Sequence, residues 1–148
     1  MTIIVWDGKT LAADRQMTSG YVKAGALKIT KCVNTGRLIG ASGNWNASVA
    51  MINWVLAGED ITKFPPSQND KDDWARTLII EPDKSIWEYE RYPIRTRTFP
   101  LEHFHAIGSG REVAYGALAM GADAVTAVQI ASKFVEGCGC GVDTLTLE

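Results

Sequence analysis

The sequence predicts an α+β domain in which two antiparallel β-sheets are covered by helices, and three observations predict it. Segments rich in β-branched and aromatic residues dominate the first half of the chain. The dipeptide Asp7–Gly8 lies between two apolar runs, which is the strongest short signal for a β-hairpin. The expected order is strands, one helix, strands, two helices and a strand, without the βαβ alternation that predicts a parallel sheet.

The first two strands are expected to form a hairpin. A two-residue turn at Asp7–Gly8 would place Thr2 opposite Ala13 and bring the carboxylate of Asp14 beside the chain start. Further strands are expected where β-branched and aromatic residues recur between turn signals. The expected strands cover residues 2–6, 9–15, 21–31, 37–43, 74–81, 85–92, 104–107 and 142–147.

Three helices are expected. Apolar residues recur at helical spacing between residues 47 and 55, Asn44 or Asn46 can cap the N-terminus, and the helix ends near Gly58. A polar stretch with two prolines follows and predicts a loop. The other two helices are expected at residues 111–120 and 124–136.

Length and composition favour one ordinary globular domain over residues 1–148. A net charge of −2 gives no reason to expect nucleic acid or an acidic membrane as a partner. The start of the chain lacks the features of a signal peptide, and the longest apolar stretch is too short to span a bilayer. Three cysteines suit a reducing compartment, so a cytoplasmic location is expected.

Thr2 carries the strongest functional signal, because removal of Met1 would leave it at the N-terminus. An N-terminal threonine can attack through its hydroxyl while its own α-amine serves as the base. The mechanism also needs a cation, a carboxylate that holds the cation, and backbone N–H groups for the oxyanion. Lys28, Asp14 and the glycine-containing turn at residues 40–43 offer these groups.

Each of these residues also has an ordinary structural explanation. Many proteins begin with Met-Thr. Asp14 can pair with Arg15 or Lys9 at a strand edge, and Lys28 can be a solvated strand lysine. Ser109, between two glycines, is typical of a turn. Taken singly, none of these residues identifies a catalytic site.

A metal site is the other chemistry that the sequence allows. His103 and His105, with Cys138 and Cys140, contain the donor atoms of a zinc site. The spacings typical of zinc sites are absent. We therefore expect neither a metal nor an organic cofactor.

Taken in order, these residues resemble proteasome β-type subunits, most closely those of the HslV type. The matching stretches are residues 2–5, 11–15, 27–29, 38–43 and 106–110. Lys28 matches the catalytic lysine of the family. Gly40 matches the glycine whose N–H forms the oxyanion hole, and Ser109 matches the serine that supports the threonine and its amine.

The resemblance implies the N-terminal nucleophile hydrolase fold, a four-layer αββα sandwich. It also implies a threonine peptidase that cleaves peptides or unfolded proteins inside a homo-oligomeric ring, with an AAA+ ATPase as a possible partner. Two alternatives remain: a catalytically inactive scaffold subunit, and an amidase for small molecules on the same fold.

The chain departs from the family in two places. It has room for one helix where the family has two, so one helical layer is expected to be shortened. The family also carries an acidic residue and a serine near the end of the last helix. Glu136 can fill the acidic position, but the sequence has no serine there.

Overall fold

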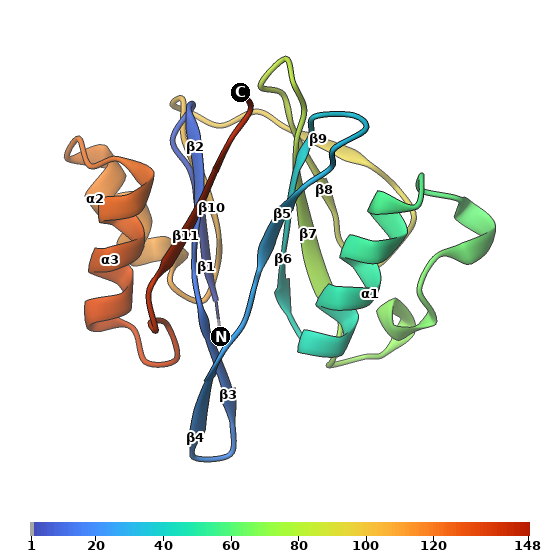
Figure 1. The fold of residues 1–148 in the computed structure, drawn as a ribbon, viewed down its shortest axis with the longest axis horizontal. Coiled ribbons are helices and arrows are strands. Elements are labelled where there is room, and N and C mark those ends of the chain that lie inside the picture. The colour runs from blue at the N-terminus through green and yellow to red at the C-terminus, as the bar shows by residue number, and fades with distance from the viewer. Residues whose placement is uncertain (1) are drawn as a thin grey trace.

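The structure, a computed structural model, describes residues 2–148 and has four layers (Figure 1). Helices α2 (Arg111–Ala119) and α3 (Ala124–Phe134) cover one sheet, and α1 (Trp45–Leu56) covers the other. The layer over the second sheet is completed by short 3₁₀ turns, η1 (Ile61–Lys63) and η2 (Pro66–Asn69). The predicted αββα sandwich with a shortened helical layer is confirmed.

All strand pairs are antiparallel. The first sheet has the strand order β10-β1-β2-β11, the second has the order β5-β6-β7-β8-β9, and β3 and β4 form a separate hairpin. The strands are β1 (Ile3–Trp6), β2 (Thr10–Asp14), β3 (Gln16–Ser19), β4 (Val22–Gly25), β5 (Ile29–Lys31), β6 (Leu38–Gly43), β7 (Ala75–Ile80), β8 (Ile86–Tyr89), β9 (Thr96–Thr98), β10 (His105–Gly108) and β11 (Val142–Thr146).

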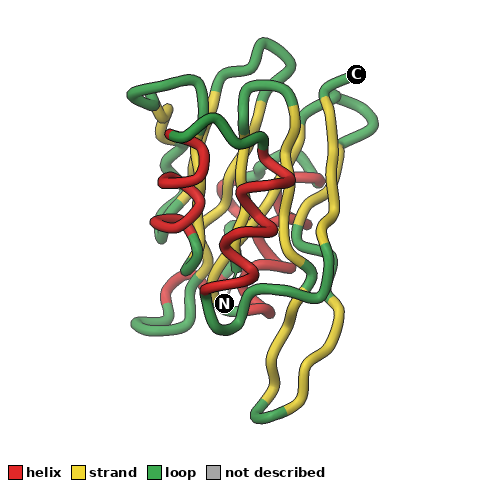
Figure 2. Tube along the Cα trace, turned by 90° about the vertical axis from the view of Figure 1, so that its left-hand side faces the viewer, coloured by secondary structure: helices red, strands yellow, loops and turns green. Residues whose placement is uncertain are grey.

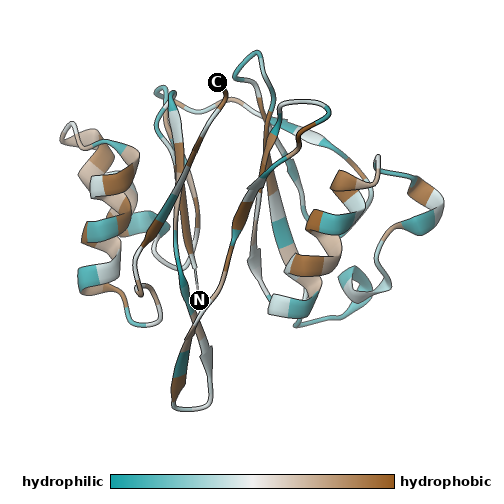
Figure 3. Cartoon of the chain, in the orientation of Figure 1, coloured by the Kyte–Doolittle hydropathy of each residue, from teal (hydrophilic) through white to brown (hydrophobic). Residues whose placement is uncertain are grey.

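The apolar run in β1 is continuous because both faces of this strand are buried. Ile3 and Val5 pack against α2 and α3, whereas Ile4 and Trp6 pack against the second sheet. A third cluster, which includes the fully buried Met51, joins α1 to the far face of the second sheet. Figure 3 shows hydrophobic residues along the central strands and on the helices. Each large aliphatic side chain buried this way contributes about 1.5–3 kcal/mol.

The β1–β2 hairpin has a longer loop than predicted. Ile4, rather than Thr2, pairs with Ala13, so four residues separate the last paired positions, Trp6 and Leu11, and the predicted register was wrong by two. The carboxylate of Asp7 accepts hydrogen bonds from two backbone N–H groups of this loop, at 2.9 and 2.8 Å, and these bonds stabilise the longer turn. Because the shift is even, every side chain keeps its predicted face.

Residues 21–31, predicted as one strand, are divided between β4 and β5. The β3–β4 hairpin projects away from both sheets (Figures 1 and 2), and every residue of β4 is exposed. At its base, the N–H of Ala26 donates to the carbonyl of Arg15 at 2.7 Å. This bond turns the chain back, so that Lys28 enters the interior just before β5.

Glu59 holds the end of α1 against the second sheet. One of its carboxylate oxygens lies 2.7 Å from Nη1 of Arg37, and the other accepts a hydrogen bond from the hydroxyl of Tyr89 at 2.7 Å. Burial alone would raise the pKa of Glu59. The hydrogen bonds from Arg37 and Tyr89 outweigh burial and hold that pKa below its ordinary value.

This arrangement predicts a loss of stability in acid. A carboxyl group whose pKa is lower in the folded chain stabilises the fold above its unfolded pKa of about 4.3, and this contribution is lost as the pH falls through the folded pKa. We expect the free energy of unfolding, measured with urea, to fall between about pH 5 and pH 3. Glu59→Gln should be less stable at neutral pH and lose less stability in acid. Equal acid sensitivity in both proteins would contradict this assignment.

Candidate active site

Asp14, at the end of β2, is the centre of the candidate site. Its side chain is 0% exposed. Oδ1 accepts a hydrogen bond from the N–H of Ile3 at 3.1 Å and lies 2.8 Å from Nζ of Lys28. Oδ2 accepts from the N–H groups of Gly139 at 3.0 Å and Gln16 at 3.3 Å. These bonds fix both oxygens of a buried carboxylate directly behind the chain start.

Lys28 joins the two sheets at this point. Its side chain is 3% exposed and reaches Asp14 in the first sheet. Its backbone carbonyl accepts from the N–H of Ala41 in the second sheet at 3.4 Å. A solvated lysine is therefore excluded. Asp14 pairs with Lys28 instead of Arg15, which lies 3.3 Å from Asp143.

Ser109 approaches the chain start from β10. Its Oγ accepts a hydrogen bond from the backbone nitrogen of Thr2 at 3.2 Å and lies 3.4 Å from the carbonyl oxygen of Thr2. Gly108, just before it, has a φ of +103°, and a Cβ there would overlap the carbonyl oxygen of Thr2. Only glycine allows this approach. The removal of Met1 lies outside the described residues.

Solved structures resemble this chain over nearly its whole length. Eukaryotic HslV from Trypanosoma brucei matches with a TM-score of 0.69 at 20% identity, over 97% of each chain. BPH from Thiobacillus denitrificans matches with a TM-score of 0.68 at 19% identity, over 99% of this chain and 98% of that chain. The same protein in complex with epoxomicin matches with a TM-score of 0.69 at 16% identity, over the same shares.

This chain has the HslV fold. That fold is the four-layer αββα sandwich expected from the sequence. Comparison with family models and with curated proteins gave no match.

Within the HslV fold, Gly40 lies in the middle of β6, between the sheets. A Cβ on Gly40 would come within 3.0 Å of Ile29 and of Ile4. These contacts are tighter than nearly all real Cβ contacts, so the side chains around Gly40 would have to move. The absence of a side chain at this position lets the two sheets of the fold pack closely.

The backbone N–H groups of β6 alternate between its two neighbouring strands. Ala41 donates to the carbonyl of Lys28 on the side of β5, whereas Asn44 donates across to the side of β7. By this alternation the N–H of Gly40 faces β7, inside the ladder. The N–H of Gly43 faces the side of Lys28, beyond the residues that pair with β5. The oxyanion role expected at Gly40 therefore suits Gly43 better.

The segment after α3 contributes groups that the sequence analysis did not assign. Besides the N–H of Gly139, it places Sγ of Cys138 3.9 Å from Oγ of Ser109. Burial raises the pKa of Cys138 and the charge of Asp14 raises it further, so the thiol stays neutral. No hydrogen bond or ion pair joins Glu136 to the site among residues 2–148.

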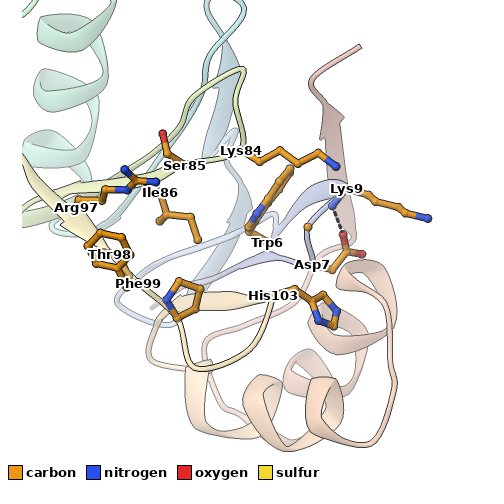
Figure 4. Close-up of a pocket in the computed structure, with 12 residues that line it drawn as sticks. Trp6, Asp7, Lys9, Lys84, Ser85, Ile86, Arg97, Thr98, Phe99 and His103 are labelled. Carbon is orange, nitrogen blue, oxygen red and sulfur yellow. Dashed lines mark hydrogen bonds between the residues drawn. The ribbon is translucent and has the colours of Figure 1, made fainter.

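Of two cavities of similar volume, one lies away from this site and the other borders it. One of about 480 Å³ lies at the opposite end of β1, around Trp6, Ile86 and Arg97 (Figure 4), and none of the candidate catalytic residues lines it. Another, of about 460 Å³, lies between the β3–β4 hairpin and the end of α3, with Gln16 and Cys138 in its wall. The second cavity borders the surroundings of Asp14 and Ser109.

Residues 2–148 contain no group of three or more His, Cys, Asp or Glu side chains arranged to hold a metal ion. In the same range, no helix combines the length and the apolar character needed to cross a bilayer.

Proposed function

We propose that this protein is a threonine-type endopeptidase that hydrolyses peptide bonds with Thr2 as the nucleophile, after removal of Met1. The observation that supports this most is the buried Lys28–Asp14 pair at 2.8 Å, directly behind the start of β1. A buried charge pair is costly to maintain for stability alone, whereas a fixed cation beside a hydroxyl is useful for catalysis. The HslV fold supports the same proposal.

The proposed reaction begins when Oγ of Thr2 attacks the carbonyl carbon of the peptide. The α-amine of Thr2 takes the hydroxyl proton and later gives it to the leaving amine. Lys28, held by Asp14, stabilises the negative charge that develops on Oγ. The N–H of Gly43 receives the oxyanion, and Ser109 orients the amine. An ester to Thr2 forms, and water then hydrolyses it.

We also propose that the working form is a homo-oligomeric ring. The tip of the β3–β4 hairpin supports this, because Tyr21 is 105% exposed and Val22 is 68% exposed. Exposed apolar groups on a projecting two-stranded hairpin are typical of a contact surface. The substrate is then a peptide or an unfolded protein that enters the ring. An AAA+ ATPase partner and a cytoplasmic location belong to the same proposal.

Intact mass spectrometry before and after treatment with an epoxyketone tests the function. That warhead reacts with both the hydroxyl and the free amine of an N-terminal threonine. We expect the mass without Met1 and a single adduct per chain on Thr2, in a sample that light scattering shows to be an oligomer. Retained Met1 without an adduct would favour the scaffold alternative. A free Thr2 in a monomer that cleaves small amides would favour the amidase.

A further inference from the structure

β10 is an edge strand of the first sheet, and side chains of α2 take the place of a neighbouring strand. The N–H of Ala106 donates to Oη of Tyr115 at 3.2 Å. Further along, the carbonyl of Gly108 accepts from Nη1 of Arg111 at 3.1 Å. Without such partners an edge strand bonds to water or to a foreign strand. Helix α2 therefore completes this edge and fixes β10.

The hydroxyl of Tyr115 is itself held by His105, whose Nδ1 lies 2.9 Å away. Oη accepts from Ala106, and the hydroxyl can also donate its own proton to Nδ1 of His105. Nε2, on the other side of the His105 ring, lies 3.4 Å from Oε1 of Glu88. His105 thus lies between the hydroxyl of Tyr115 and the carboxylate of Glu88.

Glu88 anchors this row of side chains in the second sheet. It is 9% exposed, accepts a short hydrogen bond from the hydroxyl of Thr98, and lies 3.5 Å from Nη1 of Arg76. Burial alone would raise the pKa of Glu88, but His105 and Thr98 lower it, so the carboxylate is charged at neutral pH. A continuous polar connection thus runs from β7 through β8 and β10 to α2.

The strand anchored in this way carries the turn that contacts the chain start. Ser109 follows Ala106 by three residues, and the intervening Gly108 fits against the carbonyl of Thr2 with no room for a side chain. A displacement of β10 relative to β1 would therefore move Oγ of Ser109 relative to the nitrogen of Thr2, now 3.2 Å away.

We propose that Tyr115, fixed by His105 and Glu88, is a positioning residue for Thr2. It contacts neither Thr2 nor the substrate. It acts by holding β10, and β10 sets the distance between Ser109 and the amine of Thr2. The effect that we expect on kcat for peptide hydrolysis rests on the proposed function.

The variant Tyr115→Phe tests this, because it keeps the ring that packs against Phe104 and removes only the hydroxyl. We expect kcat for a fluorogenic peptide to fall about five- to tenfold with KM unchanged, since a lost hydrogen bond disturbs the reacting atoms and not peptide binding. The matched control is Tyr89→Phe, which removes a hydroxyl bonded to Glu59 in the α1 layer. The control should keep the wild-type kcat.

A second measurement separates this proposal from the proposed function. In ¹⁵N-labelled protein produced with Thr2 at its N-terminus, the chemical shift of the α-amine nitrogen should change in Tyr115→Phe and stay constant in Tyr89→Phe. Should the wild type cleave no peptide, the proposed function fails and this shift alone decides the positioning role. A folded Tyr115→Phe protein with unchanged kcat and unchanged shift overturns the proposal. If that variant does not fold, His105→Gln takes its place under the same two criteria.

Discussion

Thr2→Ala is expected to lower kcat for peptide hydrolysis by about 10⁴-fold or more, because the variant lacks the attacking oxygen and no nearby group replaces it. Thr2→Ser keeps a hydroxyl and should retain measurable activity. Methionine is removed efficiently before small residues, so all three proteins should expose residue 2. The measurement is steady-state hydrolysis of a fluorogenic peptide, with intact mass confirming the start of each chain.

The same three proteins distinguish catalysis from folding. The backbone contacts of residue 2 with Ser109 do not depend on its side chain. Because Thr2 is buried, we expect Thr2→Ala to lower the free energy of unfolding in urea by about 1 kcal/mol, the ordinary cost of a single substitution, and to remain folded. Wild-type hydrolysis by Thr2→Ala would eliminate the N-terminal threonine mechanism.

The second large effect is expected at the buried ion pair. Asp14→Asn leaves the ammonium of Lys28, which is 3% exposed, beside a neutral side chain. Removing one partner of a buried pair costs about 3–5 kcal/mol, because the remaining charge loses its compensation. We expect the free energy of unfolding in urea to fall by this amount, together with loss of peptide hydrolysis.

A double-mutant cycle identifies the cause. Lys28→Met should cost less than Asp14→Asn, because the carboxylate keeps its bonds from the N–H groups of Ile3, Gln16 and Gly139. The double variant Asp14→Asn/Lys28→Met contains no uncompensated charge, so its stability should exceed that of Asp14→Asn alone. Its activity should remain absent, since the cation is missing. Additive losses would show that the two side chains do not interact.

Much of the fold could be predicted because its signals are local. The helix cap is such a case: of the two candidates Asn44 and Asn46, the side chain of Asn44 accepts from the N–H of Ala47 at 3.0 Å. The loop of the first hairpin was mispredicted for a local reason as well. The side chain of Asp7 bonds to two backbone N–H groups and so favours a longer turn than the Asp-Gly pattern indicates.

The candidate site was predictable as residue types but not as an arrangement. Thr2, Asp14 and Lys28 were singled out from their residue types and order in the chain, and Ser109 from the resemblance to proteasome β-type subunits. Their contacts join positions far apart in sequence, such as Thr2 with Ser109, and no local pattern encodes such contacts. The anchoring hydroxyl of Tyr115 had no sequence signal, because a tyrosine on a helix looks like any other packing residue.

The sequence by itself therefore determined the chemistry that this protein can offer and the order of its elements. Short-range propensities, caps and the position of Thr2 behind Met1 are sufficient for that. Only the tertiary structure decided which groups face the site. The direction of the N–H groups of Gly40 and Gly43 depends on the pairing of β6 with its neighbours. The burial of Lys28 depends on the packing of the two sheets. Strand pairing and sheet packing are both long-range properties of the folded chain.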